Sequence, residues 1–278
     1  MMGDLPQPVL VAEGFAFPEG PAFNQAGELF VVNIPSGEIT RIAPDGACSL
    51  FVQTGGKPNG AAFHANGELW VADCGLRAII AVSPQGEIRT VADRCGADEF
   101  RGPNDLVFDR AGNVYFTDPA GSSVENPIGC VYCVTARGEV RRVTGGLAYP
   151  NGIALSADER KLYVVETYTH SVWEYPLQAA GEVGERRLYG RLEGGTGPDG
   201  MAFDEHGVLY VANFGAGNIA VFEPGGGTPR YLPAGDERPT NVAFGGPQGT
   251  TLYITGAADN KVLKVESGVK GQRLYGDG

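Results

Sequence analysis

The segment GPDGMAFDEHGVLYVANF, residues 197–214, sets the pattern for the whole sequence. An acid and a glycine follow Pro198, then a short apolar run, a turn and a second apolar run that carries Tyr210. Two apolar runs of this length around a Gly-containing turn predict a pair of antiparallel strands. Five further copies of the opening phrase occur, and they are FPEGPAF (17–23), KPNGAAF (57–63), GPNDLVF (102–108), YPNGIAL (149–155) and RPTNVAF (238–244).

The copies are evenly spaced. Their prolines are 40–48 residues apart, and an aromatic residue follows each proline by 12–14 residues: Phe30, Trp70, Tyr115, Tyr163, Tyr210 and Tyr253. This period is typical of propeller blades. We therefore predict one all-β domain over residues 1–278, a six-bladed β-propeller with four antiparallel strands per blade and minimal helix. The inner strands should begin near residues 20, 60, 105, 152, 200 and 241, and Val9–Glu13 should pair across the termini to close the ring.

Composition excludes several functional classes. The chain has 21 Lys and Arg against 33 Asp and Glu, a net charge of −12, and no basic cluster that could contact nucleic-acid phosphates. No apolar run reaches the roughly 18 residues of a membrane helix, and the start MMGDLPQPVLV lacks a basic segment followed by an apolar one. We expect a soluble cytoplasmic protein. Its five cysteines should be reduced thiols, with Cys130 and Cys133 on opposite faces of a strand.

The repeat also gathers polar residues at one mouth of the channel. The residues that open each inner strand form an inner ring, and the ends of the second strands form an outer ring because antiparallel strands return to the same edge. Carboxylate and amide oxygens suit Ca²⁺, Mg²⁺ or Mn²⁺ better than a thiolate-bound metal. For Asn59, Asp105 and Asn241, a role in the turn that enters the strand is an equal alternative. The inner ring comprises Glu19, Asn59, Asn104, Asp105, Asn151, Asp199, Thr240 and Asn241, and the outer ring Asn33, Asp73, Asp118, Glu166 and Asn213.

FPEGPAF, RGPNDLVFDRAGNVYFTDP, YPNGIALSADERKLYVVET and GPDGMAFDEHGVLYVANF together resemble the senescence marker protein, gluconolactonase and luciferin-regenerating enzyme family, which includes regucalcin-like propellers. The resemblance extends over nearly all of residues 15–270. It implies a six-bladed propeller that holds one divalent cation in its channel and hydrolyses lactones. Calcium is the favoured cation, with zinc, manganese or magnesium as alternatives.

Carried over by position, the family's metal ligands match Glu19, Asn151 and Asp199. Asn104 matches a residue that lies at the cation or at the substrate, and Arg101 matches a substrate-binding arginine. Gly102 and Pro103 separate Arg101 from Asn104, an interval that differs among relatives.

The resulting hypothesis is a metal-dependent hydrolase that opens a neutral, hydroxyl-rich sugar lactone. Asp199 would accept a proton from the attacking water, with direct nucleophilic attack as the alternative. Asn104 and Arg101 would hold substrate oxygens, while Asp118, Tyr168 and Phe214 would shape the pocket wall. Two other functions stay open at this point. One is a metal-dependent phosphotriesterase, and the other is a non-catalytic propeller that serves as a binding platform.

Overall fold

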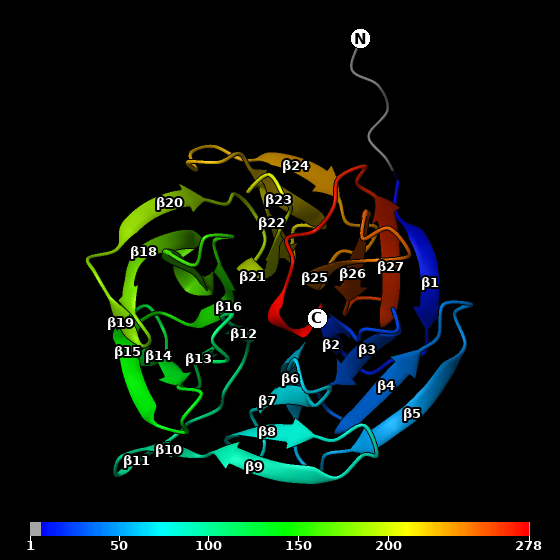
Figure 1. Cartoon of the computed structure of the whole chain (residues 1–278). Helices are drawn as coiled ribbons and strands as arrows, with labels where there is room; N and C mark the ends of the chain where they lie inside the picture. The colour runs from blue at the N-terminus through cyan, green and yellow to red at the C-terminus, as the bar shows by residue number, and fades with distance from the viewer. Residues whose placement is uncertain (1–6, 278) are drawn as a thin grey trace.

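The computed structural model describes residues 7–277, in which six antiparallel sheets are arranged in a ring around a central axis (Figure 1). The predicted six-bladed propeller is therefore confirmed. In the described residues there is no α-helix, only the two short 3-10 segments η1 (Thr167–Thr169) and η2 (Tyr275–Asp277). No helix among these residues is long and apolar enough to cross a membrane. Residues 1–6, the first part of the segment MMGDLPQPVLV considered in the sequence analysis, lie outside the described residues.

The blades follow the sequence repeat, and each inner strand begins within about three residues of the position expected. Blade 1 comprises β2 (Pro18–Phe23), β3 (Leu29–Asn33), β4 (Glu38–Ile42) and β5 (Cys48–Gln53), blade 2 comprises β6 (Pro58–Phe63), β7 (Leu69–Asp73), β8 (Ala78–Val82) and β9 (Ile88–Ala92), and blade 3 comprises β12 (Leu106–Phe108), β13 (Val114–Asp118), β14 (Gly129–Val134) and β15 (Val140–Leu147). Blade 4 comprises β16 (Pro150–Leu155), β17 (Lys161–Glu166), β18 (Ser171–Ala179) and β20 (Arg187–Arg191), with β19 (Glu182–Val183) also paired to β18. Blade 5 comprises β21 (Gly197–Phe203), β22 (Leu209–Phe214), β23 (Asn218–Phe222) and β24 (Arg230–Pro233), and a separate hairpin, β10 (Arg94–Cys95) with β11 (Asp98–Glu99), lies between blades 2 and 3.

Blade 6 joins the two ends of the chain. It comprises β25 (Pro239–Gly245), β26 (Thr251–Gly256), β27 (Lys261–Glu266) and, as its outer strand, β1 (Val9–Glu13). β1 pairs antiparallel with β27, so the N-terminal strand closes the ring as predicted. At the mouth of the channel, the Thr240 hydroxyl lies 2.7 Å from the Pro18 carbonyl oxygen and ties blade 6 to blade 1.

Neighbouring blades are held together by apolar side chains. Residues 7–277 form six buried apolar clusters, one at each blade junction. The repeated aromatic residue explains much of this packing, because at five of the six junctions it meets edge-on an aromatic residue at or next to the end of the next blade's inner strand. Trp70 packs on Phe108 with ring centroids 5.1 Å apart, and Tyr163 packs on Phe203 at 4.9 Å. Edge-on aromatic pairs contribute stability beyond the area they bury. The same arrangement recurs as Phe30–Phe63, Tyr210–Phe244 and Tyr253–Phe23.

The two cysteines of the C-x-x-C sequence behave as the strand periodicity predicts. Cys130 contributes to the cluster between blades 2 and 3, whereas Cys133 contributes to the cluster between blades 3 and 4. They therefore lie on opposite faces of β14 and cannot share a ligand.

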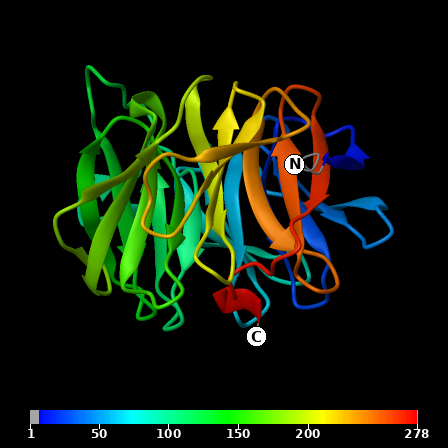
Figure 2. The ribbon, with the colours of Figure 1, turned by 90° about the horizontal axis from the view of Figure 1, so that it is seen from above.

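The C-terminal segment covers the end of the channel opposite to the mouth. Tyr275 packs on Phe108, Gln272 N donates to Phe203 O, and Gln272 Nε2 donates to Leu155 O. These three partners are the last residues of inner strands, whereas the polar rings lie where those strands begin. The segment is therefore on the face away from the rings, at the edge where the chain ends in Figure 2.

Replacing Thr240 with valine tests the hydrogen bond between blades 6 and 1. Valine keeps the shape but leaves a buried carbonyl without this donor, so the free energy of unfolding should fall by about 1–3 kcal/mol. Urea denaturation measures the change. Ser36→Ala is the control, because Ser36 is exposed and should change stability by less than about 0.5 kcal/mol. An unchanged midpoint for Thr240→Val would show that this bond contributes nothing to ring closure.

Candidate functional site

The first residues of the inner strands lie close together at the mouth because glycine follows several of them. An added Cβ at Gly60 would lie 2.5 Å from Asp105 Oδ1 in the next blade, and one at Gly152 would overlap the Asp199 carbonyl oxygen. Both distances are too short for any other residue type without a shift of the backbone. Glycine at these positions therefore allows adjacent blades to place their ring residues side by side.

Glu19 is almost fully buried at the mouth, and few hydrogen-bond donors reach its carboxylate. Its Oε2 accepts bonds from Asn241 Nδ2 at 3.0 Å and from Gly20 N at 2.8 Å. Burial raises the pKa of Glu19 to about 8, since removing water disfavours the charged carboxylate, and repulsion from Asp105 adds to this, although both hydrogen bonds oppose it.

Asp105 and Asp199 are buried beside Glu19 and share its environment. Burial raises the pKa of Asp105 to about 7, against the hydrogen bonds that Leu106 N and Ile153 N donate to it. Burial also raises the pKa of Asp199 well above its usual value. The charges of Glu19 and Asp105 raise it further, and a hydrogen bond from Asn151 partly opposes them. The structure thus brings together Glu19, Asn151 and Asp199 and places Asp105, another residue of the predicted inner ring, beside them.

This group of acids fits a bound cation by its chemistry. None of the ion pairs among residues 7–277 includes Glu19, Asp105 or Asp199, so these carboxyl groups have no Lys or Arg partner there to stabilise their ionised forms. Buried charges are normally paired or bind metals. In the described part of the chain, no three His, Cys, Asp or Glu side chains form a metal site by themselves. Amide oxygens, such as those of Asn104 and Asn151, would therefore have to complete the coordination.

The outer ring differs from the sequence-based expectation. Its side chains do not add oxygens to a common cage, because they are bound within their own blades. Asp73 Oδ1 accepts a bond from Lys57 N, Asp118 Oδ1 accepts one from Gly102 N, and Glu166 Oε1 accepts one from Ala148 N. Each of these bonds fixes the loop that enters the inner strand. Asn33 Oδ1 likewise accepts a bond from Ala16 N, whereas Asn213 Nδ2 donates one to Glu193 O. The sequence alone did not reveal this role, since the partners are backbone groups.

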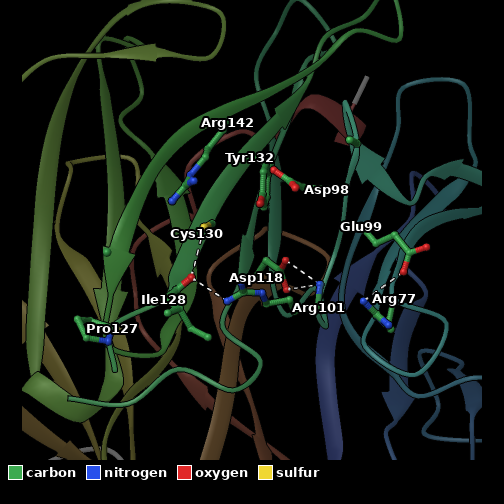
Figure 3. Close-up of a pocket in the computed structure, with 12 residues that line it drawn as sticks. Arg77, Asp98, Glu99, Arg101, Asp118, Pro127, Ile128, Cys130, Tyr132 and Arg142 are labelled. Atoms are coloured by element: carbon green, nitrogen blue, oxygen red, sulfur yellow. Dashed lines mark hydrogen bonds and ion pairs between the residues drawn. The ribbon is translucent and has the colours of Figure 1, made fainter. Parts of the chain in front are cut away.

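Arg101 and Asp118, two of the predicted substrate-binding residues, lie in a cleft between blades 2 and 3 (Figure 3). The Asp118 carboxylate accepts a hydrogen bond from Arg101 N at 2.9 Å, so it positions the main chain of Arg101. The Arg101 side chain is exposed, and its Nη1 lies 3.5 Å from Ile128 O. No residue of the inner ring lines this cleft. The substrate-binding roles of Arg101 and Asp118 stay predictions.

Aromatic residues flank the mouth. Tyr168, predicted to bind substrate, is 42% exposed on η1, and its ring lies 4.9 Å from that of Tyr149. Burial raises the pKa of Tyr149 to about 12, and the charges of Asp199 and Glu19 add to this, which places its phenol near the acids. Tyr149 has a φ of +66°, and Phe17, whose ring stacks on Phe214 at 6.1 Å, has a φ of +49°.

Such backbone strain in bulky residues is concentrated at functional sites. Both residues directly precede the proline of the repeated phrase, in blades that lie opposite one another. Sequence reasoning missed Phe17 and Tyr149. The sequence does contain a signal for them: two of the six repeats carry an aromatic residue before the proline, where the other four carry Lys, Gly or Arg.

Comparison with known proteins finds relatives that match nearly the whole chain. The chain is 32% identical to a diisopropyl-fluorophosphatase from Loligo vulgaris over 95% of its own length and 93% of the relative's. It is 31% identical to a gluconolactonase from Zymomonas mobilis over 95% of its length and 82% of the relative's.

Solved structures show the same fold. A gluconolactonase from Xanthomonas campestris superimposes with a TM-score of 0.83 at 23% identity, covering 95% of each chain. A luciferin-regenerating enzyme superimposes with a TM-score of 0.84 at 22% identity, covering 96% of this chain and 99% of that one. The family model for the SMP-30/gluconolactonase/LRE-like region matches residues 17–258. The chain therefore belongs to the SMP-30/gluconolactonase/LRE-like family.

Proposed function

We propose that this protein is a divalent-cation-dependent lactonase whose site is the inner ring at the channel mouth. The observation that carries the proposal is the buried group of Glu19, Asp105 and Asp199, which has no cationic side chain paired with it among residues 7–277. The similarity to a gluconolactonase supports the choice of a lactone as substrate. A cytoplasmic location is part of the same proposal.

Glu19, Asn151 and Asp199 would hold the cation, with Asn104 or water completing the coordination. Calcium is the favoured metal, because carboxylate and amide oxygens in a set of six to eight suit it. When bound, a divalent cation supplies a positive charge that polarises a carbonyl group and lowers the pKa of water. Zinc, manganese and magnesium are the alternatives.

Asp199 would act on the proton of the attacking water. Its oxygen accepts this proton as the water oxygen bonds to the lactone carbonyl carbon. The ring C–O bond then breaks, and the ring oxygen takes a proton to give a hydroxy acid. Direct attack by Asp199 on the carbonyl carbon is the alternative route.

The surrounding residues would bind the substrate. Asn104 opens the inner strand of blade 3 and would donate its amide to substrate oxygens. Tyr168 and Tyr149 would contact the apolar face of the sugar ring, since aromatic rings supply contact area at small entropic cost. Asp118 would act through Arg101 by fixing its main chain. Arg101 would contact those substrates that extend toward its cleft.

A second candidate is hydrolysis of an organophosphorus ester or fluoride. The specific observation in its favour is the 32% identity to a diisopropyl-fluorophosphatase, which extends along nearly the whole chain. The same ring would serve, because a cation polarises a phosphoryl oxygen as it does a carbonyl.

The first prediction concerns substrate and metal. Glucono-1,5-lactone should be hydrolysed far faster than diisopropyl fluorophosphate, and both rates should vanish in a strong chelator and return with added Ca²⁺. Proton release in weakly buffered solution measures lactone opening, and fluoride release measures the other reaction. Circular dichroism should show that the chelated protein keeps its strands, since the blade cores are apolar. Full turnover after exhaustive chelation would refute the metal. Faster fluorophosphate turnover would favour the second candidate, and no turnover of either would favour a binding platform.

Asp199→Asn tests the base. Asparagine keeps an oxygen for the cation but cannot take the proton, so kcat should fall about 10²- to 10⁴-fold. Calcium affinity, measured by isothermal titration calorimetry, should weaken less than turnover does. Asp45→Asn is the matched control, because Asp45 is an exposed acid away from the ring and its loss should leave turnover unchanged. Near-normal turnover of the Asp199→Asn protein with calcium bound would assign the proton transfer to another residue.

The raised pKa values predict how the metal-free protein responds to pH. Glu19 has a folded pKa of about 8 against an ordinary value of 4.5, and Asp105 about 7 against 3.8. At pH values between the ordinary and the folded pKa of each acid, the folded protein binds more protons than the unfolded chain. The contribution of these two acids to stability is therefore complete below about pH 4 and is lost as the pH rises toward 8. Denaturation with urea in chelator at pH 5, 7 and 9 measures the slope.

Glu19→Gln should reduce that slope, because it removes one of the titrating groups, whereas the exposed Glu87→Gln control should not. Calcium affinity should rise over the same range as the acids lose their protons. A stability that does not change between pH 5 and 9 in both wild type and Glu19→Gln would contradict the raised pKa of Glu19.

A further inference from the structure

Three hydrogen bonds hold the strained turn at Tyr149. Two of them come from blade 4 itself: Ala148 N donates to Glu166 Oε1 at 2.6 Å, and Thr167 N donates to Tyr149 O at 3.0 Å. The third comes from outside the blade. Tyr149 N donates at 3.3 Å to the hydroxyl oxygen of Ser122, a residue of the loop between β13 and β14 in blade 3. A bulky residue in the left-handed region is strained, and it persists only where its surroundings over-determine it.

Ser122 is almost fully buried, and all of its hydrogen-bonding capacity is used. Its hydroxyl donates to Leu147 O and accepts from Gly129 N as well as from Tyr149 N. A hydroxyl group has one proton and two lone pairs, so these three bonds use every one of them. Gly129 allows the close approach, because an added Cβ there would overlap Cδ of Pro150. The Ser122 hydroxyl therefore joins a loop of blade 3 to the turn that enters blade 4.

Phe17, in the opposite blade, is held by the same pattern of bonds (Figure 1). Ala16 N donates to Asn33 Oδ1 at 2.9 Å, and Ile34 N donates to Phe17 O at 3.4 Å. Phe17 N donates at 2.9 Å to Asn260 Oδ1, and Asn260 belongs to the turn between β26 and β27 of blade 6. At both strained residues, the third bond is thus made by a side chain of the preceding blade in the ring.

Blades 2 and 3 lack this third bond, and their backbone differs accordingly. In blade 2 the outer-ring residue Asp73 accepts directly from N of Lys57, the residue before the proline. In blade 3 Asp118 accepts from N of the equivalent Gly102. Neither Lys57 nor Gly102 has a positive φ. In blades 1 and 4 the outer-ring residue binds one residue earlier, so the N–H of the aromatic residue is left for a partner from another blade.

The two strained residues carry rings that flank the mouth from opposite sides. The Tyr149 ring lies 4.9 Å from that of Tyr168, and the Phe17 ring stacks at 6.1 Å on that of Phe214, the last residue of β22. Because each ring is attached to a backbone in a strained conformation, its direction depends on the bonds that hold that backbone.

We propose that Ser122 and Asn260 are positioning residues for substrate binding, each of which locks one of the two strained aromatic residues. Both rings are then already oriented when a substrate arrives at the mouth. Orientation in advance strengthens binding, because less conformational freedom is lost in the complex. The inference rests on the proposed function, since it takes the substrate to bind at the inner ring. Neither Ser122 nor Asn260 would touch the substrate or the cation.

Steady-state kinetics with glucono-1,5-lactone in the presence of calcium test this role. Ser122→Ala should raise KM about threefold to tenfold, the usual worth of a hydrogen bond. It should leave kcat and calcium affinity unchanged, because the loss falls on ground state and transition state alike. Ser267→Ala is the matched control. Its hydroxyl also donates to a carbonyl, Thr250 O, and accepts from Val269 N, but on the face away from the mouth, so its loss should not change KM.

Further variants separate positioning from a general loss of structure. In a Tyr149→Ala background, Ser122→Ala should raise KM no further, because the ring that Ser122 positions is already gone. Asn260→Gly removes the oxygen that holds Phe17 but keeps a residue that readily adopts the φ of +52° at this position, and it should raise KM as Ser122→Ala does. Asn260→Asp keeps the oxygen and should keep KM near that of wild type. Since Asn260 is only half-buried, Asn260→Gly decides the matter if Ser122→Ala does not fold.

Equal KM values in wild type, Ser122→Ala and Asn260→Gly would overturn the proposal, as would a further rise in KM when Ser122→Ala is added to Tyr149→Ala. If the wild type opens no lactone, the proposed function fails by itself, and crystal structures of the same variants decide the positioning role. In these, φ of Tyr149 should leave the left-handed region in Ser122→Ala, and φ of Phe17 should do so in Asn260→Gly. Unchanged φ values in both variants would overturn the proposal.

Discussion

The close approach of neighbouring inner strands at the channel mouth is the constraint on which the rest of this structure depends. Six blades can meet there only if little side-chain volume intervenes, and Gly60 and Gly152 provide the space at two junctions. Hydroxyl groups then join adjacent blades: Thr117 Oγ1 donates to Asn151 O and Thr167 Oγ1 donates to Pro198 O, both at 2.7 Å. At the other end of the inner strands, edge-on aromatic pairs join adjacent blades through the core. The blades are thereby fixed in angle, and the residues that open their inner strands are fixed with them.

Tight packing at the mouth has an electrostatic cost that defines the site. Burial removes most of the water from Glu19, Asp105 and Asp199, and the charges of neighbouring acids add to this effect at Glu19 and Asp199, so the pKa of each of the three is raised and each holds its proton to unusually high pH. A polypeptide that needed only a stable ring would place apolar or amide side chains there. Acids at this point are stabilised if a positive charge joins them, and perturbed acids of this kind are typical of functional sites. The stability of the empty ring and the affinity for a cation are therefore opposed properties of the same three side chains.

The repeat made the fold predictable, because one phrase and one aromatic residue recur in every blade and each has a local structural meaning. The inner ring was predictable for the same reason, as Glu19, Asn151 and Asp199 occupy equivalent positions. The roles of the outer-ring acids and of Arg101 could not be predicted, because they depend on contacts that do not follow from the repeat. The outer-ring acids bind backbone N–H groups, so their residue type resembles that of a ligand while their role is to fix loops. Arg101 follows the β10–β11 hairpin, which stands outside the blades, and both Arg101 and residues of the hairpin line a cleft between blades 2 and 3.

Closure of the ring by both chain ends has a consequence for how the site is assembled in time. Glu19 and its hydrogen-bond partner Asn241 are 222 residues apart in the chain, and they face each other across the junction of blades 6 and 1. Contacts of such long sequence separation form late in folding, because a long loop must close first. During synthesis, several blades can fold before Asn241 exists. The mouth is then complete only when the last blade docks on the first. A ligand that bridges this junction would bind the closed ring alone, so it would slow the opening of the seam and lengthen the lifetime of the native protein.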